Sequence, residues 1–212
     1  MSYSANKALW HHDSISAIKA GRHPYPRHLE LVISDLCNHD CGFCSYRMSG
    51  HPSNELFQIE KGTSRKARNP NRQIPTEKVV EILSDAADMG VKGVQFTGGG
   101  EPTIHPDFVK LMAIAQSLSL DTALVTNGRE LRHEAVREVA RNTVWTRISI
   151  DASTPESYCN ERGVSRGHWR DMVYGATSLL YEARQEKSDI EIGAGFVVTP
   201  RNYTEIRDAV AL

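Results

Sequence analysis

Three cysteines lie within eight residues of one another in the first quarter of the chain. Cys37, Cys41 and Cys44 have the spacing C-x3-C-x2-C, and the sequence contains one further cysteine, Cys159. Thiolates are soft ligands that suit iron–sulfur clusters and zinc. Three ligands are one fewer than a closed four-coordinate site needs, so the spacing predicts an open metal position or a distant fourth ligand. Phe43 would place an aromatic ring beside such a centre.

A run of three glycines, Gly98 to Gly100, is followed by Glu101 and Pro102. Glycines leave backbone N–H and C=O groups accessible, which suits either a phosphate or an ammonium group. A phosphate-binding loop would continue with Lys-Ser/Thr, whereas an acidic residue favours a cationic group. For the glycines alone, a tight turn with positive φ is a sufficient explanation.

Other polar residues follow later predicted strands. Asn127 precedes a glycine in a turn signal. Ser149 and Asp151 alternate with isoleucines, so we expect both to face the inside of the fold. Arg162 precedes Gly163 after a short predicted helix, where a surface arginine is a sufficient explanation. Cys159 could be a fourth ligand, a substrate radical site or, as we expect, a plain buried thiol.

A regular alternation of elements would position these residues. Short apolar runs predict strands at residues 29–34, 91–97, 121–126, 145–151 and 190–198. Apolar residues at helical spacing predict helices at 14–20, 76–89, 106–118, 132–141, 155–162 and 167–185, and another that begins at 203. This order predicts an α/β fold with a parallel sheet. Periodicity alone does not separate an open partial (β/α) barrel from a flat doubly wound sheet.

The cysteine motif with its aromatic residue resembles the signature of the radical S-adenosylmethionine (radical SAM) superfamily, and Gly99-Gly100-Glu101-Pro102 resembles its GGEP motif. The resemblance implies that the three cysteines hold a [4Fe–4S] cluster whose open iron binds SAM. It also implies that Gly99, Gly100 and Glu101 hold the SAM amino group.

Weaker similarities extend the implied cofactor site. Asn127 resembles the turn near the cofactor, Ser149 and Asp151 would lie near the ribose and carboxylate, and Arg162 would bind the carboxylate. Val198, with its neighbour Val197, would contact the adenine, although ordinary core positions are an equal alternative.

The resemblance favours the open partial (β/α) barrel, a partial TIM barrel with six units. Five strands are predicted, so we expect the chain to be truncated before the sixth. Residues 1–27 would form an N-terminal extension and residues 28–212 an incomplete radical SAM core. The implied activity is reductive cleavage of SAM to a 5′-deoxyadenosyl radical that abstracts hydrogen from an unidentified peptide, protein or small molecule. A flavodoxin- or ferredoxin-like protein would donate the electron.

A basic insertion at 45–74 interrupts this pattern. It carries six cations against Glu55 and Glu60: Arg47, Lys61, Arg65, Lys66, Arg68 and Arg72. The insertion is either a solvated loop or a lid for an anionic substrate, so a nucleic-acid-modifying enzyme is the alternative within this superfamily.

Composition limits the other classes of function. The formal net charge is −1, which argues against a nucleic-acid or membrane partner attracted by bulk charge. Clustered cysteines, and an N-terminus without an apolar run, predict a cytoplasmic protein without a signal peptide. A non-catalytic iron–sulfur or zinc module and a nucleotide-binding regulator are the alternatives of another class.

Overall fold

The computed structural model describes residues 11–47 and 72–212. Five strands form its sheet: β1 (His28–Val32), β2 (Gly93–Thr97), β3 (Asp121–Thr126), β4 (Thr143–Ser149) and β5 (Glu191–Gly195). The α-helices are α1 (His12–Lys19), α3 (Thr76–Asp88), α4 (Phe108–Ser117), α5 (His133–Asn142), α6 (Pro155–Arg162), α7 (Arg166–Gln185) and α8 (Ile206–Val210). Short 3-10 helices are η2 (Ser45–Arg47), η4 (Pro102–Ile104) and η5 (Tyr203–Glu205).

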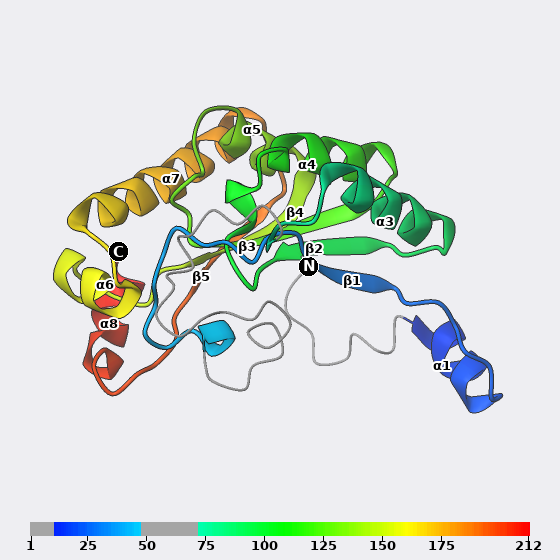
Figure 1. Ribbon diagram of the computed structural model, residues 1–212, viewed down its shortest axis with the longest axis horizontal. Helices are drawn as coiled ribbons and strands as arrows, with labels where there is room; N and C mark the ends of the chain where they lie inside the picture. The colour runs from blue at the N-terminus through cyan, green and yellow to red at the C-terminus, as the bar shows by residue number, and fades with distance from the viewer. Residues whose placement is uncertain (1–10, 48–71) are drawn as a thin grey trace.

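The sheet is parallel throughout and its strands follow their order in the chain, β1-β2-β3-β4-β5. Helices α3, α4, α5 and α7 arch over one face of this sheet (Figure 1). A doubly wound sheet would reverse its strand order and carry helices on both faces. The sequential order and single helical layer therefore identify an open partial (β/α) barrel, as expected.

The hydrophobic core lies between the sheet and the helical layer. Alternate strand residues such as Phe96 and Leu124 point toward the helices and are fully buried, together with Leu83 and Leu179 from the helices. Residues of the opposite face are more polar and more exposed, including Arg147 on β4. This difference between the faces follows from the two-residue period of a strand.

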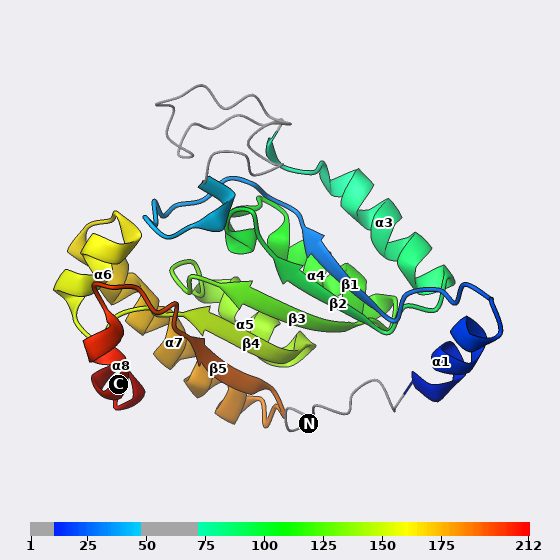
Figure 2. The same ribbon diagram turned by 90° about the horizontal axis from the view of Figure 1, so that it is seen from below.

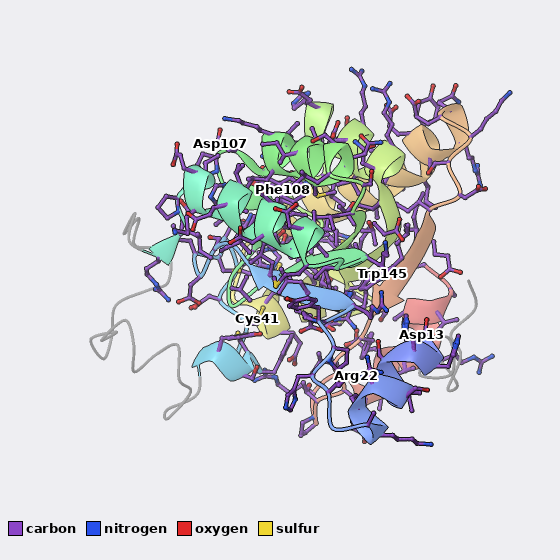
Figure 3. All side chains as sticks on the ribbon, turned by 90° about the vertical axis from the view of Figure 1, so that its right-hand side faces the viewer. Asp13, Arg22, Cys41, Asp107, Phe108 and Trp145 are labelled. Carbon is purple, nitrogen blue, oxygen red and sulfur yellow. The ribbon has the colours of Figure 1, made fainter. Side chains whose placement is uncertain are left out.

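Loops that follow the strands gather at one edge of the sheet. Seen from the face without the helical layer, α6, α8 and residues 35–44, which carry the three cysteines, lie at this edge, and α1 lies at the other (Figure 2). Figure 3 shows Phe108 on the helix-covered side of the sheet and Cys41 on the other side. Among the described residues, no helix combines the length and apolar composition of a membrane span.

Every predicted strand and helix exists, but several predicted ends are wrong. Strand β1 ends at Val32, and Ser34 instead forms an isolated antiparallel bridge with Gln73. Helix α4 begins at Phe108 rather than Pro106, because Asp107 is its N-cap.

The ends of β4 and β5 also differ from the prediction. Strand β4 begins at Thr143, two residues early, and pairs there with Thr122. It ends at Ser149, two residues early, and Asp151 beyond it has a left-handed backbone with φ of 58°. Strand β5 ends at Gly195, and beyond it the N–H of Val197 donates to Oδ1 of Asp151 at 2.6 Å. Val198 therefore lies outside the strand, contrary to the prediction.

Candidate metal and cofactor site

The cysteine loop, residues 35–44, carries three thiols at the edge of the sheet. Cys37, Cys41 and Cys44 are partly buried and none of them forms a disulfide. The backbone N–H of His39 donates to Sγ of Cys37 at 3.4 Å, and Nη1 of Arg162 donates to Sγ of Cys41 at 3.7 Å. Such N–H···S contacts stabilise thiolates that bind an iron–sulfur cluster. The donor set therefore fits this type of centre.

The thiols would lose their protons on binding a metal. Burial, and secondly the charge of Glu101, raise the pKa of Cys37 to about 12. Burial also raises the pKa of Cys41, although Arg162 opposes the increase. Among the described residues, no three His, Cys, Asp or Glu side chains are close enough together to hold a single metal ion. A cubane cluster takes one thiolate per iron, so its ligands need not converge on one point.

The glycine segment after β2 holds the start of the cysteine loop by backbone contacts. The N–H of Gly100 donates to Ser34 O at 3.0 Å, and the N–H of Glu101 donates to Leu36 O at 2.8 Å. A Cβ atom at Gly100 would overlap the carbonyl oxygen of Leu36. None of the three glycines has a positive φ. Close approach of two backbones, rather than a tight turn with positive φ, is the reason for glycine at this position.

Glu101 joins the end of β2 to the end of β3. Its Oε1 accepts from Thr103 Oγ1 and Thr126 Oγ1, both at 2.6 Å, and from Thr103 N–H at 3.1 Å. Its Oε2 accepts from the N–H of Asn127 at 2.7 Å. Burial raises the pKa of the Glu101 carboxyl, and these four bonds oppose the increase. Three donors saturate Oε1, so Oε2 alone retains capacity for a further donor.

Asn127 ties the end of β3 to the cysteine loop. Its Nδ2 donates to Oδ1 of Asn38 at 2.7 Å, and its Oδ1 accepts from the N–H of Arg129 at 3.0 Å. Asn38, between the first two cysteines, also donates to Oε1 of Glu130 at 3.4 Å. The side chain predicted to approach the cofactor thus positions the loop in this structure.

Arg162, Asp151 and Ser149 come together under the cysteine loop. Nη2 of Arg162 donates to the carbonyl oxygen of Ser149 at 2.6 Å and to a carboxylate oxygen of Asp151. Asp151 lies beyond the end of β4 and has a left-handed backbone, so its predicted place on the strand was wrong. Burial lowers the pKa of Arg162, but the charges of Cys41 and Asp151 outweigh it and raise the pKa, so the guanidinium is charged.

The C-terminus of α6 is a docking point for the cysteine loop. The N–H of Asp40 donates to Arg162 O at 2.9 Å, and the N–H of Gly42 donates to Glu161 O at 3.1 Å. The residue after the helix, Gly163, has φ of 59°, and a Cβ there would lie 2.6 Å from Asp40 O. These contacts satisfy helix carbonyls that otherwise lack partners.

Two ion pairs beside the loop were not predicted. Arg72 and Asp35 form a pair in which both side chains are 7% exposed, and Asp35 N–H donates to Arg72 O at 2.8 Å. Nε of Arg201 donates to Glu161 at 2.6 Å, close to Gly42. The two residues of each pair are 37 or more positions apart in the sequence. Charge alone does not show which of the many charged residues of the chain will pair. The sequence held no signal for either pair.

The remaining predicted site residues are less closely integrated. The ring of Phe43 lies beside the guanidinium of Arg162, with 5.7 Å between its centroid and Cζ of Arg162. Val198 is 59% exposed beyond β5. Cys159 is partly buried on α6. The predicted lid falls mostly on residues 48–71, outside the described residues.

Comparisons with known proteins agree with this geometry. Residues 31–211 match the family described as the radical SAM superfamily. A probable GTP 3′,8-cyclase of Pyrobaculum aerophilum is 27% identical over 182 residues, which are 86% of this chain and 51% of that protein. An S-adenosylmethionine-dependent nucleotide dehydratase of Flammeovirga pacifica is 30% identical over 116 residues, or 55% of this chain and 35% of that protein. The chain thus spans about half the length, or less, of these curated relatives.

Solved structures share the fold. Streptococcus suis SuiB bound to its precursor peptide SuiA superposes with a TM-score of 0.65 at 20% identity, over 100% of this chain and 42% of SuiB. The enzyme anSMEcpe with bound AdoMet superposes with a TM-score of 0.61 at 17% identity, over 87% of this chain and 47% of that protein.

Proposed function

The chain belongs to the radical SAM superfamily, and from this premise we propose that it is the core of an enzyme that holds a [4Fe–4S] cluster at Cys37, Cys41 and Cys44. When bound, the cluster and SAM together supply the one-electron chemistry that yields a 5′-deoxyadenosyl radical. One observation supports the proposal most strongly: the loop with the three thiols is held by the segments that follow β2, β3 and β4. Such preorganisation is what a cluster that must accept and release a cofactor requires.

The protein's own groups would bind and orient the cofactor. The remaining capacity of Oε2 of Glu101 suits the ammonium group of SAM, and Gly99 and Gly100 remain predicted contacts of the same group. Ser149 and Asp151 remain predicted contacts of the ribose and carboxylate, and Val198 of the adenine. Asn127 remains a predicted cofactor neighbour. An external flavodoxin- or ferredoxin-like protein remains the predicted electron donor.

For the substrate, we propose a small anionic molecule of the nucleotide class. The two curated relatives named above carry nucleotide names, whereas the peptide-bound neighbour is similar in fold alone. The supporting feature of this chain is Arg147, an exposed cation on the sheet face without the helical layer. Among the residues that the structure describes, Arg147 forms no ion pair. Gly193, its partner in the register of neighbouring β5, leaves open space beside it, whereas the Arg147 side chain itself lies against Gly195.

Metal content and SAM turnover test the cofactor proposal. The protein would be reconstituted with iron and sulfide without oxygen, reduced with dithionite and incubated with SAM. We expect close to four irons per chain and formation of 5′-deoxyadenosine, both lost in a Cys41→Ala variant. Tightly bound zinc without SAM turnover would instead support the structural metal module.

The substrate proposal is tested separately by equilibrium binding of GTP to the reconstituted protein. Arg147→Gln should weaken binding by about 10-fold, which corresponds to the loss of one charged hydrogen bond. Lys110→Gln, on α4 of the opposite layer, is the matched charge control. Equal affinities of the two variants would reject Arg147 as the anion-binding residue.

A further inference from the structure

Arg162 is a buried cation in direct contact with a proposed cluster ligand. Its side chain is 5% exposed, and Nη1 points at Sγ of Cys41 at 3.7 Å. Two acceptors fix the other end of the guanidinium, the carbonyl oxygen of Ser149 and the carboxylate of Asp151. Because Asp151 also accepts from the N–H of Val197, its own orientation is fixed.

The same guanidinium lies over two aromatic rings. Its Cζ lies 5.7 Å from the ring centroid of Phe43 and 5.5 Å from that of Tyr158. Tyr158 is fully buried and packs against Trp169 at 5.3 Å between ring centroids. A cation between two rings and two acceptors has little freedom to move away from Cys41.

We propose that Arg162 is a positioning residue that holds Cys41 for the cluster and raises the reduction potential of the bound cluster through its N–H···S bond and its positive charge. The inference rests on the proposed function. Reduction adds negative charge to the cluster and its sulfurs, so a donor and a cation beside one sulfur stabilise the reduced state more than the oxidised state. The donor to Cys37 is the backbone of His39, whereas the donor to Cys41 is the charged side chain of Arg162.

This role is distinct from the carboxylate-binding role that the sequence predicts for Arg162. The guanidinium has five N–H groups, and the contacts above use three of them. Nε is buried and has no partner among the described residues. The contact with Cys41 uses one of the five N–H groups, so its loss and a loss of carboxylate binding can be measured separately.

The test is a redox titration of the reconstituted cluster, followed by EPR in the absence of SAM. Arg162→Gln should shift the midpoint potential to a more negative value and weaken iron retention against a chelator by about 10- to 100-fold. Arg166→Gln removes the same charge from an exposed residue of α7, which pairs with Glu156, and should match the wild type.

An unchanged midpoint potential in Arg162→Gln would overturn the inference. This holds even if the variant shows an altered EPR response to SAM. If Arg162→Gln retains no cluster, Arg162→Lys decides, because lysine keeps the charge without the planar fork. Its potential should lie below that of the wild type, and equality would overturn the inference. Failure of the wild type to take up a cluster would instead reject the proposed function.

Discussion

Replacement of Gly163 by alanine should separate the docked cysteine loop from α6. Alanine costs about 1–2 kcal/mol in the left-handed conformation that Gly163 adopts, with φ of 59°. The new Cβ would also lie 2.6 Å from the carbonyl oxygen of Asp40, so the loop must shift. That shift weakens the bonds from the N–H groups of Asp40 and Gly42, each of which contributes about 1 kcal/mol. If between half and all of these two bonds is lost, the total destabilisation is about 2–4 kcal/mol.

Gly90 provides the matched control. It follows α3 with φ of 83°, but a Cβ there would meet nothing within 4 Å. Gly90→Ala should therefore cost the conformational part alone, about 1–2 kcal/mol. Urea unfolding of the metal-free protein would measure both variants, and the rate of thiol labelling would report on the loop. Equal destabilisation of the two variants, with unchanged labelling, would refute the docking of the loop on Gly163.

Three further substitutions test other contacts. Glu101→Gln should destabilise the protein by about 1.5–3 kcal/mol in urea unfolding, because the amide nitrogen cannot accept from one of the present donors; an unchanged midpoint would contradict this. Asp35→Asn should cost about 3–5 kcal/mol, because it leaves Arg72 buried without its ion pair, and Asp35→Leu combined with Arg72→Met should recover most of the loss. Burial raises the pKa of Glu205, but hydrogen bonds from Ser157 and Ser153 lower it by more, so the pKa in the folded protein lies below its ordinary value of about 4.3. Glu205 therefore stabilises the fold above that pH, and this stabilisation is lost as the pH falls through the lowered pKa. Glu205→Gln should flatten this acid-dependent loss, and parallel pH profiles would contradict the reasoning.

The sequence predicted the fold and the meeting of the motifs for a simple physical reason. Parallel strands place their carboxyl ends at one edge of the sheet, so residues that follow successive strands must lie near one another. The positions of the cysteines, the glycine segment and Asn127 follow from that rule. The choice of a partial barrel over a doubly wound sheet required the family resemblance. The periodicity of apolar residues does not show whether the helices cover one face of the sheet or both.

The local geometry of the site was less predictable. Alternation placed Asp151 on a strand, but a left-handed residue, not visible in the pattern, ends the extended backbone there. Val198 was assigned to β5 because apolar residues continue past Gly195, whereas the backbone turns to bond Asp151. Arg162 was predicted to face the cofactor, and its contacts with Cys41 and Ser149 depend on tertiary packing that no local signal records.

We propose that the three cysteines leave one iron of the cluster open to SAM. The most direct measurement is the EPR spectrum of the reconstituted, reduced protein with and without SAM. We expect a reduced [4Fe–4S] signal that changes when SAM is added. A cluster signal that is indifferent to SAM, or a protein that retains zinc in place of iron, would contradict it.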